Sequence, residues 1–220
     1  MRRSVAARLV VAALILWAVL DVLRTVLAVG HYENRIEVVT HGNVDVLPAW
    51  LAYVIVSELM PRDAVTVAAD RLWMLGALVA AAAFVAWLHQ ARRTAGRLGG
   101  ALTWAPGWVV GGWFVPVANL MIPYLVVRDV RRASGPAARL APVGRWWVSV
   151  LGTVFLYLLS RLYAVVTSHG GRLHETALDT RTAAYPLWTA GTVMVVVTAV
   201  LSIRVARRIS EAQDGFGPQT

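Results

Sequence analysis

The sequence contains neither cysteine nor lysine, and both absences limit what the protein can be. A chain without cysteine forms no disulfide, no thiolate metal site and no cysteine nucleophile. Because lysine is missing, all 21 positive residues are arginine, and with frequent Ala, Val and Gly this usage is typical of a GC-rich bacterial genome. Acidic residues number only 12, which leaves a net charge of +9.

Motifs of familiar catalytic sites are missing as well. The sequence shows no nucleophile–base pair, no dinucleotide fingerprint and no phosphate-binding loop, since Gly111-Gly112 lacks the strand and helix start that such a loop requires. Ser160 has no histidine partner within the apolar segments. We therefore expect a protein that is not an enzyme, that has no catalytic residues and that carries no cofactor.

Hydrophobic residues make up 58% of the chain, and the mean hydropathy of +0.61 exceeds that of most soluble domains. Long uncharged runs predict an all-α, polytopic membrane helical bundle, because about 20 apolar residues of helix cross the hydrocarbon core. We expect one integral membrane domain over residues 1–208 and a flexible cytoplasmic tail over 209–220. The four spans are expected at about 9–29, 72–88, 146–167 and 185–205.

The first apolar run has a second interpretation as a cleaved signal peptide, because Ala28 and Gly30 resemble a small-residue cleavage site. Two observations favour a retained span. The run is long for a signal sequence, and Asp21 and Arg24 interrupt its second half.

Arginine placement predicts the orientation, because positive residues in short loops stay in the cytoplasm. Arginines cluster before the first span and in the segments 92–97, 128–145 and 204–208, whereas the loops 30–71 and 168–183 together carry more acids than arginines. Four spans with both termini in the cytoplasm of a bacterial inner membrane place all the clusters on one side. Anionic lipid headgroups explain this charge better than nucleic acid does.

The segment 106–132 is rich in Gly, Trp and Pro, and it is apolar enough to enter a membrane although it is broken. If it crossed the membrane once, the arginine clusters before and after it would lie on opposite faces. A re-entrant or interfacial hairpin that turns near Pro116 and Asn119 keeps both clusters in the cytoplasm. A pair of surface helices and a kinked full span are the alternatives, and a turn within the hydrocarbon requires shielding by protein or water.

Aromatic residues predict two further elements at the membrane interface. The apolar stretch 47–60 is too short to span and contains Trp50 and Tyr53, which suits a helix lying at the interface or over the bundle. The pair Trp146 and Trp147 is expected to anchor the third span at the interface.

Three charges fall within the expected spans, where insertion is costly and a functional role is the default hypothesis. Asp21 and Arg24 are three residues apart and share a helix face, while Arg161 lies at a similar depth in the third span. Arg24 and Arg161 are therefore both candidate partners for Asp21. A structural ion pair, or arginines that extend to the interface, is the simpler interpretation.

Four histidines fall in the expected outer loops together with acidic residues, which allows the hypothesis of a zinc site. Their spacing, however, never places two histidines four residues apart on one helix. We therefore interpret them as ordinary loop residues and expect no metal site. The histidines are His31, His41, His169 and His174.

The returning arm of the broken segment ends in a basic cluster. Arg128 and Arg132 are four residues apart on one helix face, where they are suited to lipid phosphates or to an acidic partner. Anchoring by the positive-inside rule alone is the alternative. Asp129 is expected to pair with Arg132 or with an arginine of 92–97.

Residues 107–134 read GWVVGGWFVPVANLMIPYLVVRDVRRAS, and this pattern resembles the signature of actinobacterial multi-pass membrane proteins that carry domain of unknown function 4328. The stretch 86–93 resembles that family too, although Thr94 stands where an asparagine is often expected. The resemblance covers about 72–208 and implies the architecture without any established activity. The matching residues are Gly107, Trp108, Gly112, Trp113, Phe114, Pro116, Asn119, Pro123, Tyr124, Arg128, Asp129 and Arg132.

The function expected from these observations is that of a non-enzymatic accessory or interaction protein of the membrane. Its arginine-rich cytoplasmic face is expected to bind membrane lipids, another membrane protein or a second copy of the chain. The alternative is a small transporter or channel in which 106–132 lines a polar path, because broken intramembrane segments mark transport sites in other proteins.

Overall fold

The computed structural model describes the chain over 5–41, 64–115, 118–168 and 185–215. Within these ranges, the side chains of 31–41 and 164–168 are not described. The interface helix expected over 47–60 therefore lies outside the described residues.

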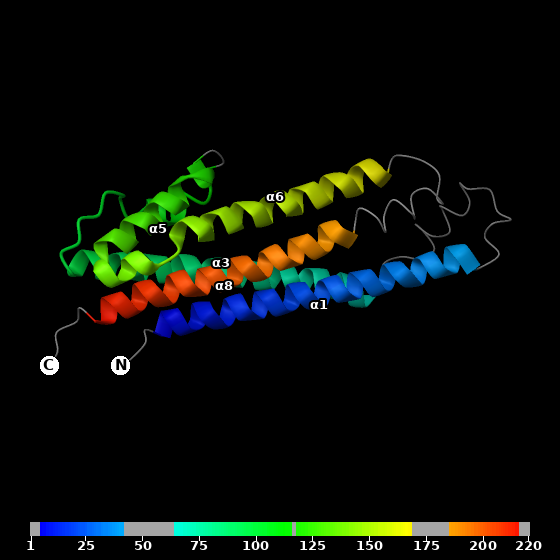
Figure 1. Ribbon diagram of the computed structural model, residues 1–220, viewed down its shortest axis with the longest axis horizontal. Coiled ribbons are helices and arrows are strands. Elements are labelled where there is room, and N and C mark those ends of the chain that lie inside the picture. Colours follow the sequence, from blue (N-terminus) through cyan, green and yellow to red (C-terminus); the bar gives the residue numbers. More distant parts are fainter. Residues whose placement is uncertain (1–4, 42–63, 116–117, 169–184, 216–220) are drawn as a thin grey trace. The chain divides into compact units, whose positions relative to one another are not determined.

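Four long helices account for most of the described chain and confirm the predicted all-α membrane bundle. Each is long and apolar enough to cross a membrane, and between 22% and 33% of the residues in their most apolar stretches are buried within the protein. Most of the apolar surface is therefore left for lipid, which is the natural solvent of such helices. The helices are α1 (Val5–His41), α3 (Ala64–Arg97), α6 (Val143–Ser168) and α8 (Tyr185–Asp214) (Figure 1).

The helix α8 is longer than its expected span, and the prediction of a flexible tail from Ile209 onward is wrong for residues 209–214. Val205, Ile209 and Ala212 are buried, while Arg208 between them is exposed. This spacing is that of one apolar face of a helix. A search for uncharged runs stops at the arginines, whereas the helix continues because its inner face is still apolar.

The segment 106–132 consists of short helical pieces, so the alternative of a single kinked span is wrong. Glycines interrupt its first arm, and Pro123 starts the helix of the second arm, where a missing amide costs nothing. At 1.5 Å per residue that second helix, with 12 residues, is about 18 Å long, too short to cross a bilayer. The pieces are α4 (Trp108–Gly111), η3 (Ala118–Leu120) and α5 (Ile122–Ala133), followed by η4 (Pro136–Leu140).

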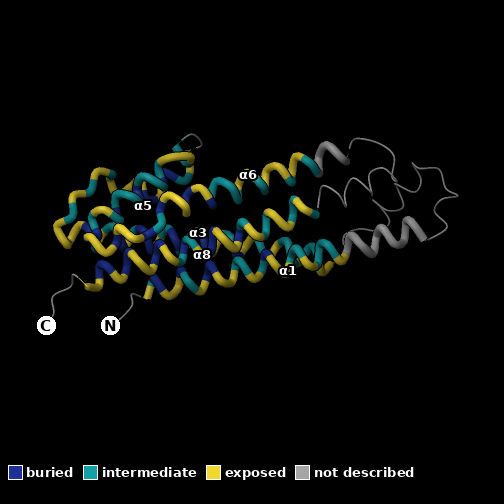
Figure 2. The backbone as a smooth tube through the Cα atoms, viewed as in Figure 1, coloured by how far each residue is buried: buried dark blue, intermediate teal, exposed yellow. Residues whose placement is uncertain are grey.

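The described chain divides into two compact units, and every long helix contributes a part to both. Unit 1 takes its residues from 1–17, 76–152 and 196–220, and unit 2 from 18–75 and 153–195. The broken segment and the arginine clusters belong to unit 1. Figure 2 shows buried positions, in dark blue, along the inner sides of the helices and exposed positions, in yellow, on their outer sides.

The core of unit 1 contains a cluster of aromatic rings. Phe84 lies 5.3 Å from both Trp87 and Trp146, measured between ring centroids. Trp146 and Trp147 are 1% and 7% exposed, so their rings pack inside the protein, while their expected place at the level of the membrane interface stays a prediction. A buried indole must place its N–H on an acceptor, and Trp146 Nε1 donates to Ser202 Oγ of α8 at 2.9 Å.

Unit 2 is joined by smaller contacts between its helices. Thr25 of α1 and Thr192 of α8 share a hydroxyl hydrogen bond of 2.7 Å. Trp73 of α3 stacks on Tyr157 of α6 with 5.9 Å between the ring centroids. Within unit 2 the first contact thus connects α1 with α8, and the second connects α3 with α6.

Candidate functional site

The broken segment folds back on itself, and Asp129 of α5 closes it. The backbone amides of Thr103 and Trp104 donate to Asp129 Oδ2 at 2.8 Å and 3.3 Å, and the hydroxyl of Thr103 donates to Oδ1 at 3.3 Å. Arg92 of α3 donates to the carbonyl of Trp104. The start and the end of the segment are thus held together beside α3, and we call residues 103–133 the hairpin.

This role of Asp129 differs from the expected one. In the described part of the chain its carboxylate forms no ion pair with Arg132 or with an arginine of 92–97, so that prediction is wrong. Backbone amides occupy the carboxylate oxygens instead. The donors, Thr103 and Trp104, lie 26 and 25 residues before Asp129 in the sequence. Arguments from helix spacing do not reach that far.

The two arms of the hairpin touch at Gly112. A Cβ placed there would lie 2.7 Å from Ile122 Cγ2 and 2.9 Å from the carbonyl oxygen of Trp108. Carbon atoms do not approach so closely, so the position requires glycine. Gly111 and Gly107 have no atom within 4 Å of such a Cβ. The close approach therefore singles out Gly112 among these glycines.

Tryptophans attach the hairpin to α6. Trp113 meets Trp147 edge to face, with 6.3 Å between ring centroids and an interplanar angle of 73°. Trp147 Nε1 donates to the carbonyl of Leu120 at 3.0 Å, which satisfies a backbone acceptor that the short η3 leaves open. The Nε1 atom of Trp113 is buried and has no partner among the described residues.

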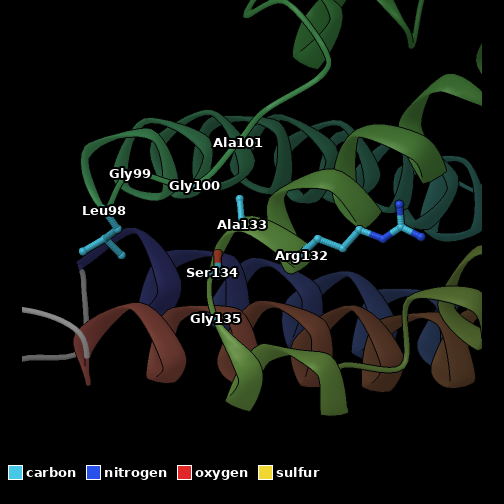
Figure 3. A pocket seen from close by; sticks show the side chains of 8 residues that line it. All are labelled: Leu98, Gly99, Gly100, Ala101, Arg132, Ala133, Ser134 and Gly135. Carbon is cyan, nitrogen blue, oxygen red and sulfur yellow. The ribbon is translucent and has the colours of Figure 1, made fainter.

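The base of the hairpin is an open hollow where α3 and α5 both end. Its volume is about 390 Å³, and Figure 3 shows Gly99 and Gly100 on one side of it facing Ala133 and Gly135 on the other. Gly99 and Gly135 have φ angles of 79° and 91°, which glycine adopts readily just after a helix. In Figure 3 the guanidinium of Arg132 extends away from the hollow.

Arginines dominate the charge of unit 1. Asp129, Glu211 and Asp214 are its described acidic residues. Across the described part of unit 1, no arginine forms an ion pair with a carboxylate. The arginines are Arg8, Arg92, Arg93, Arg97, Arg128, Arg131, Arg132, Arg139, Arg145, Arg204, Arg207 and Arg208.

Two arginines of α5 are held by other groups. The Cζ atom of Arg128 lies 5.5 Å from the ring centroid of Tyr124, a cation–π distance. Arg131 donates to the carbonyl of Ala141 at 3.4 Å. Arg132 and Arg139 are exposed, so the base of the hairpin presents uncompensated positive charge to its surroundings.

A buried network that sequence reasoning missed ties α8 to the base of the hairpin. Gln213 Nε2 donates to the carbonyl of Ala91 at 2.7 Å and to Ser134 Oγ at 2.8 Å. The hydroxyl of Ser134 donates in turn to the carbonyl of Val130 at 2.7 Å. Continued apolar periodicity after Val205 was the available signal, because it would have kept Gln213 on a helix.

Unit 2 contains the intramembrane charges. Arg24 Nη2 lies 3.1 Å from Asp21 Oδ1, and Arg24 Nη1 lies 3.9 Å from Asp70 Oδ1. The expected pair between Asp21 and Arg24 is confirmed, whereas Arg161 is exposed and forms no ion pair among the described residues. The guanidinium of Arg24 also lies 4.6 Å above the ring centroid of Trp73.

The pair is only partly satisfied by its neighbours. Asp21 is 1% exposed, and its Oδ2 atom has no hydrogen-bond partner among the described residues. The same is true of Arg24 Nε. Unit 2 therefore holds an ion pair whose carboxylate is buried and whose guanidinium is partly exposed, and neither side chain has all its hydrogen bonds among the described residues.

The described residues contain no group of three or more His, Cys, Asp and Glu that could hold a metal ion. The side chains of His31 and His41 and the residues His169 and His174 lie outside what is described. The absence of a metal site in that region stays a prediction. Pro116 of the motif also lies outside the described residues.

Comparison with known proteins places this arrangement in a family. No curated protein and no solved structure matches the chain. One family model matches residues 57–211, which include α3, the hairpin, α6 and nearly all of α8 but not α1. Asp21 and Arg24 thus lie outside the matched region, and the hairpin lies within it. Since the match covers most of its length, the chain belongs to the family described as a domain of unknown function, DUF4328.

Proposed function

We propose that this membrane protein binds anionic lipid through the arginine-rich face of unit 1 and acts as a non-enzymatic interaction protein. One observation carries the proposal. The carboxylate of Asp129 is occupied by the amides of Thr103 and Trp104, which leaves the neighbouring Arg128 and Arg132 without an acidic partner.

The chemistry of the guanidinium supports lipid phosphate as the ligand. Arginine offers a planar fork of N–H donors that matches a phosphate, and basic residues close to a membrane surface attract anionic headgroups by about 1 kcal/mol each. Arg128 and Arg132 are four residues apart and therefore lie on one face of α5. The other exposed arginines of unit 1 add to the positive electrostatic potential that attracts anionic headgroups.

The orientation follows from the same charges. With both termini in the cytoplasm of a bacterial inner membrane, the arginine-rich face meets the inner leaflet, where the positive-inside rule expects it. An actinobacterial source and the multi-pass topology belong to this proposal too. They rest on the arginine usage and on the four long apolar helices.

The proposal is tested by titrating phosphatidylglycerol into the purified protein in neutral detergent and following its unfolding temperature. We expect stabilisation by phosphatidylglycerol and none by phosphatidylcholine. The double variant Arg128→Gln/Arg132→Gln should lower the apparent affinity roughly 30-fold, the equivalent of about 2 kcal/mol. The matched control, Arg71→Gln/Arg161→Gln, removes two exposed arginines from unit 2 and should leave the affinity unchanged.

Equal affinities for both double variants would contradict the proposal. Co-purification of another membrane protein, lost in Arg128→Gln/Arg132→Gln, would instead identify the ligand as an acidic protein surface. A solute flux above that of empty vesicles, measured after reconstitution, would favour the alternative of a small transporter or channel.

A further inference from the structure

The far end of the hairpin carries large apolar side chains that the protein leaves uncovered. Phe114 is 79% exposed, Met121 is 63% exposed and Leu120 is 58% exposed. Val110 and Val115 add apolar surface at 46% and 47% exposure. Since the outgoing and the returning arm both contribute, these five residues form one apolar end, which we call the hairpin tip.

Several backbone groups beside the tip are paired within the protein. The amides of Gly112, Phe114 and Met121 donate to carbonyls three or four residues earlier at distances of 3.0–3.2 Å. The carbonyl of Leu120 accepts the indole N–H of Trp147. Pairing of this kind lowers the cost of bringing a peptide segment into contact with lipid, which offers no hydrogen bonds to free backbone groups.

The contact with α6 sets the level of the tip along the bundle. Trp147 lies four residues after Val143, the first residue of α6, so the carbonyl of Leu120 lies beside the start of this long apolar helix. Arg145, within the first turn of α6, is exposed. In a helix that crosses a membrane, the end with an exposed arginine is expected near the boundary between headgroups and acyl chains.

We propose that the hairpin tip inserts among the lipid acyl chains at this boundary, in the leaflet that meets the arginine-rich face. The tip is then a shallow, leaflet-specific lipid-binding surface, with the arginines of the hairpin base in the headgroup layer. Two observations select lipid as the occupant. The same apolar exposure continues on α6, where Val148 is 70% exposed, and the uncompensated arginines complement anionic headgroups.

This inference selects between the structures that the sequence left open. A pair of helices lying on the surface would direct an apolar stripe along both arms, whereas here the exposed apolar groups gather at one end. A deep re-entrant loop would place the turn near the bilayer centre, well beyond the first turn of α6. The geometry therefore favours an interfacial hairpin with only its tip in the hydrocarbon.

The natural absence of cysteine makes a direct test possible in the full-length protein. Phe114→Cys is labelled with an environment-sensitive fluorophore after reconstitution into phosphatidylcholine vesicles, and quenching by spin-labelled lipids is compared with quenching by aqueous iodide. Met121→Cys tests the other arm, and Arg139→Cys, exposed on η4, is the control. We expect the two tip labels to be quenched at least fivefold more by shallow spin-labelled lipids than by iodide, and the control label to show the reverse.

Any of three other outcomes would overturn the inference. Quenching of the tip labels by iodide would place the tip in water. Protection from both quenchers would mean that protein covers it, either a second copy or a partner. Stronger quenching by spin labels at the bilayer centre would indicate a deep re-entrant loop.

The test is independent of the proposed function, because phosphatidylcholine carries no net charge. Tip insertion in these vesicles without any preference for phosphatidylglycerol would refute the proposed lipid selectivity alone. A preference for phosphatidylglycerol that depends on Arg128 and Arg132, together with a tip in water, would refute the insertion alone.

Discussion

In unit 1 the buried polar side chains are uncharged and form hydrogen bonds within the protein. Unit 2, in contrast, buries a carboxylate beside an arginine. Trp87 Nε1 donates to Ser210 Oγ at 3.0 Å, and Trp146 Nε1 donates to Ser202 Oγ at 2.9 Å. In unit 2, Arg24 donates a hydrogen bond of 3.1 Å to Asp21, the one that the described residues supply to this carboxylate. Unit 1 has many arginines without a carboxylate partner among the described residues, and unit 2 has a buried carboxylate paired with a partly exposed arginine.

The two units therefore depend on polar groups for different reasons. A neutral pair such as indole and hydroxyl costs little to bury, and it fixes which helices meet. A buried ion pair is expensive to desolvate, and it is most sensitive to the loss of one partner. The arginines of unit 1 avoid that cost, which leaves them available to headgroups.

The largest expected effect comes from breaking the ion pair of unit 2. Asp21→Ala leaves Arg24 with only the more distant Asp70, at 3.9 Å, and should lower the free energy of unfolding by about 3 kcal/mol. Reversible unfolding in mixed micelles measures this loss. Arg161→Gln, at an exposed arginine of the same unit, should change the free energy by less than about 0.5 kcal/mol. Similar losses in both variants would show that the burial of the pair is irrelevant.

A second, smaller effect is expected from the contact between the arms of the hairpin. Gly112→Ala places a methyl group 2.7 Å from Ile122 Cγ2 and should cost about 2 kcal/mol, as overpacked sites do. The adjacent Gly111→Ala meets no atom within 4 Å and should be neutral or slightly stabilising. Unfolding temperatures of the two variants give the comparison. If both behave alike, the arms do not meet at Gly112.

Removing a side chain from the uncharged hydrogen-bond network of unit 1 should lower the free energy of unfolding less than breaking the ion pair does. Gln213→Ala removes the hydrogen bonds to Ala91 and Ser134 and should cost about 1–2 kcal/mol. Glu211→Ala, at an exposed position two residues earlier, is the control and should be close to neutral. A loss from Gln213→Ala as large as that from Asp21→Ala would remove the contrast between the units.

The smallest effect on stability is expected at the closure of the hairpin, because these groups are partly exposed. Asp129→Ala should cost about 1 kcal/mol, since water can replace the carboxylate. Its local effect is larger, because the amides of Thr103 and Trp104 lose their acceptor. Hydrogen exchange at these two amides should accelerate in Asp129→Ala and stay unchanged in the control Asp214→Ala. Unchanged exchange in Asp129→Ala would mean that another group closes the hairpin.

Local patterns predicted much of this molecule. Uncharged runs located the four long helices, and a spacing of three residues predicted the pair of Asp21 and Arg24. Glycines, prolines and the arginines on both sides predicted that 106–132 turns back. These features depend on hydropathy, on helix geometry and on chain breaks, which are all readable over a few neighbouring residues.

Long-range partners were beyond the reach of such patterns. The sequence assigned Asp129 to a nearby arginine and Gln213 to a tail, and both assignments were wrong. It also gave no sign that Trp146 and Trp147 pack inside the protein. Each of these side chains has its partner on another element, and a hydrogen bond of this kind depends on which helices pack together.

The composition and order of residues were thus sufficient to predict four long helices apolar enough to cross a membrane, because transfer into lipid is a property of segments. Packing alone decided that amides rather than arginines take the carboxylate of Asp129. That choice leaves Arg128 and Arg132 without a carboxylate, and it holds the hairpin closed with its apolar tip uncovered. The reason is geometric, because a carboxylate binds the donors that the fold brings within about 3 Å of it.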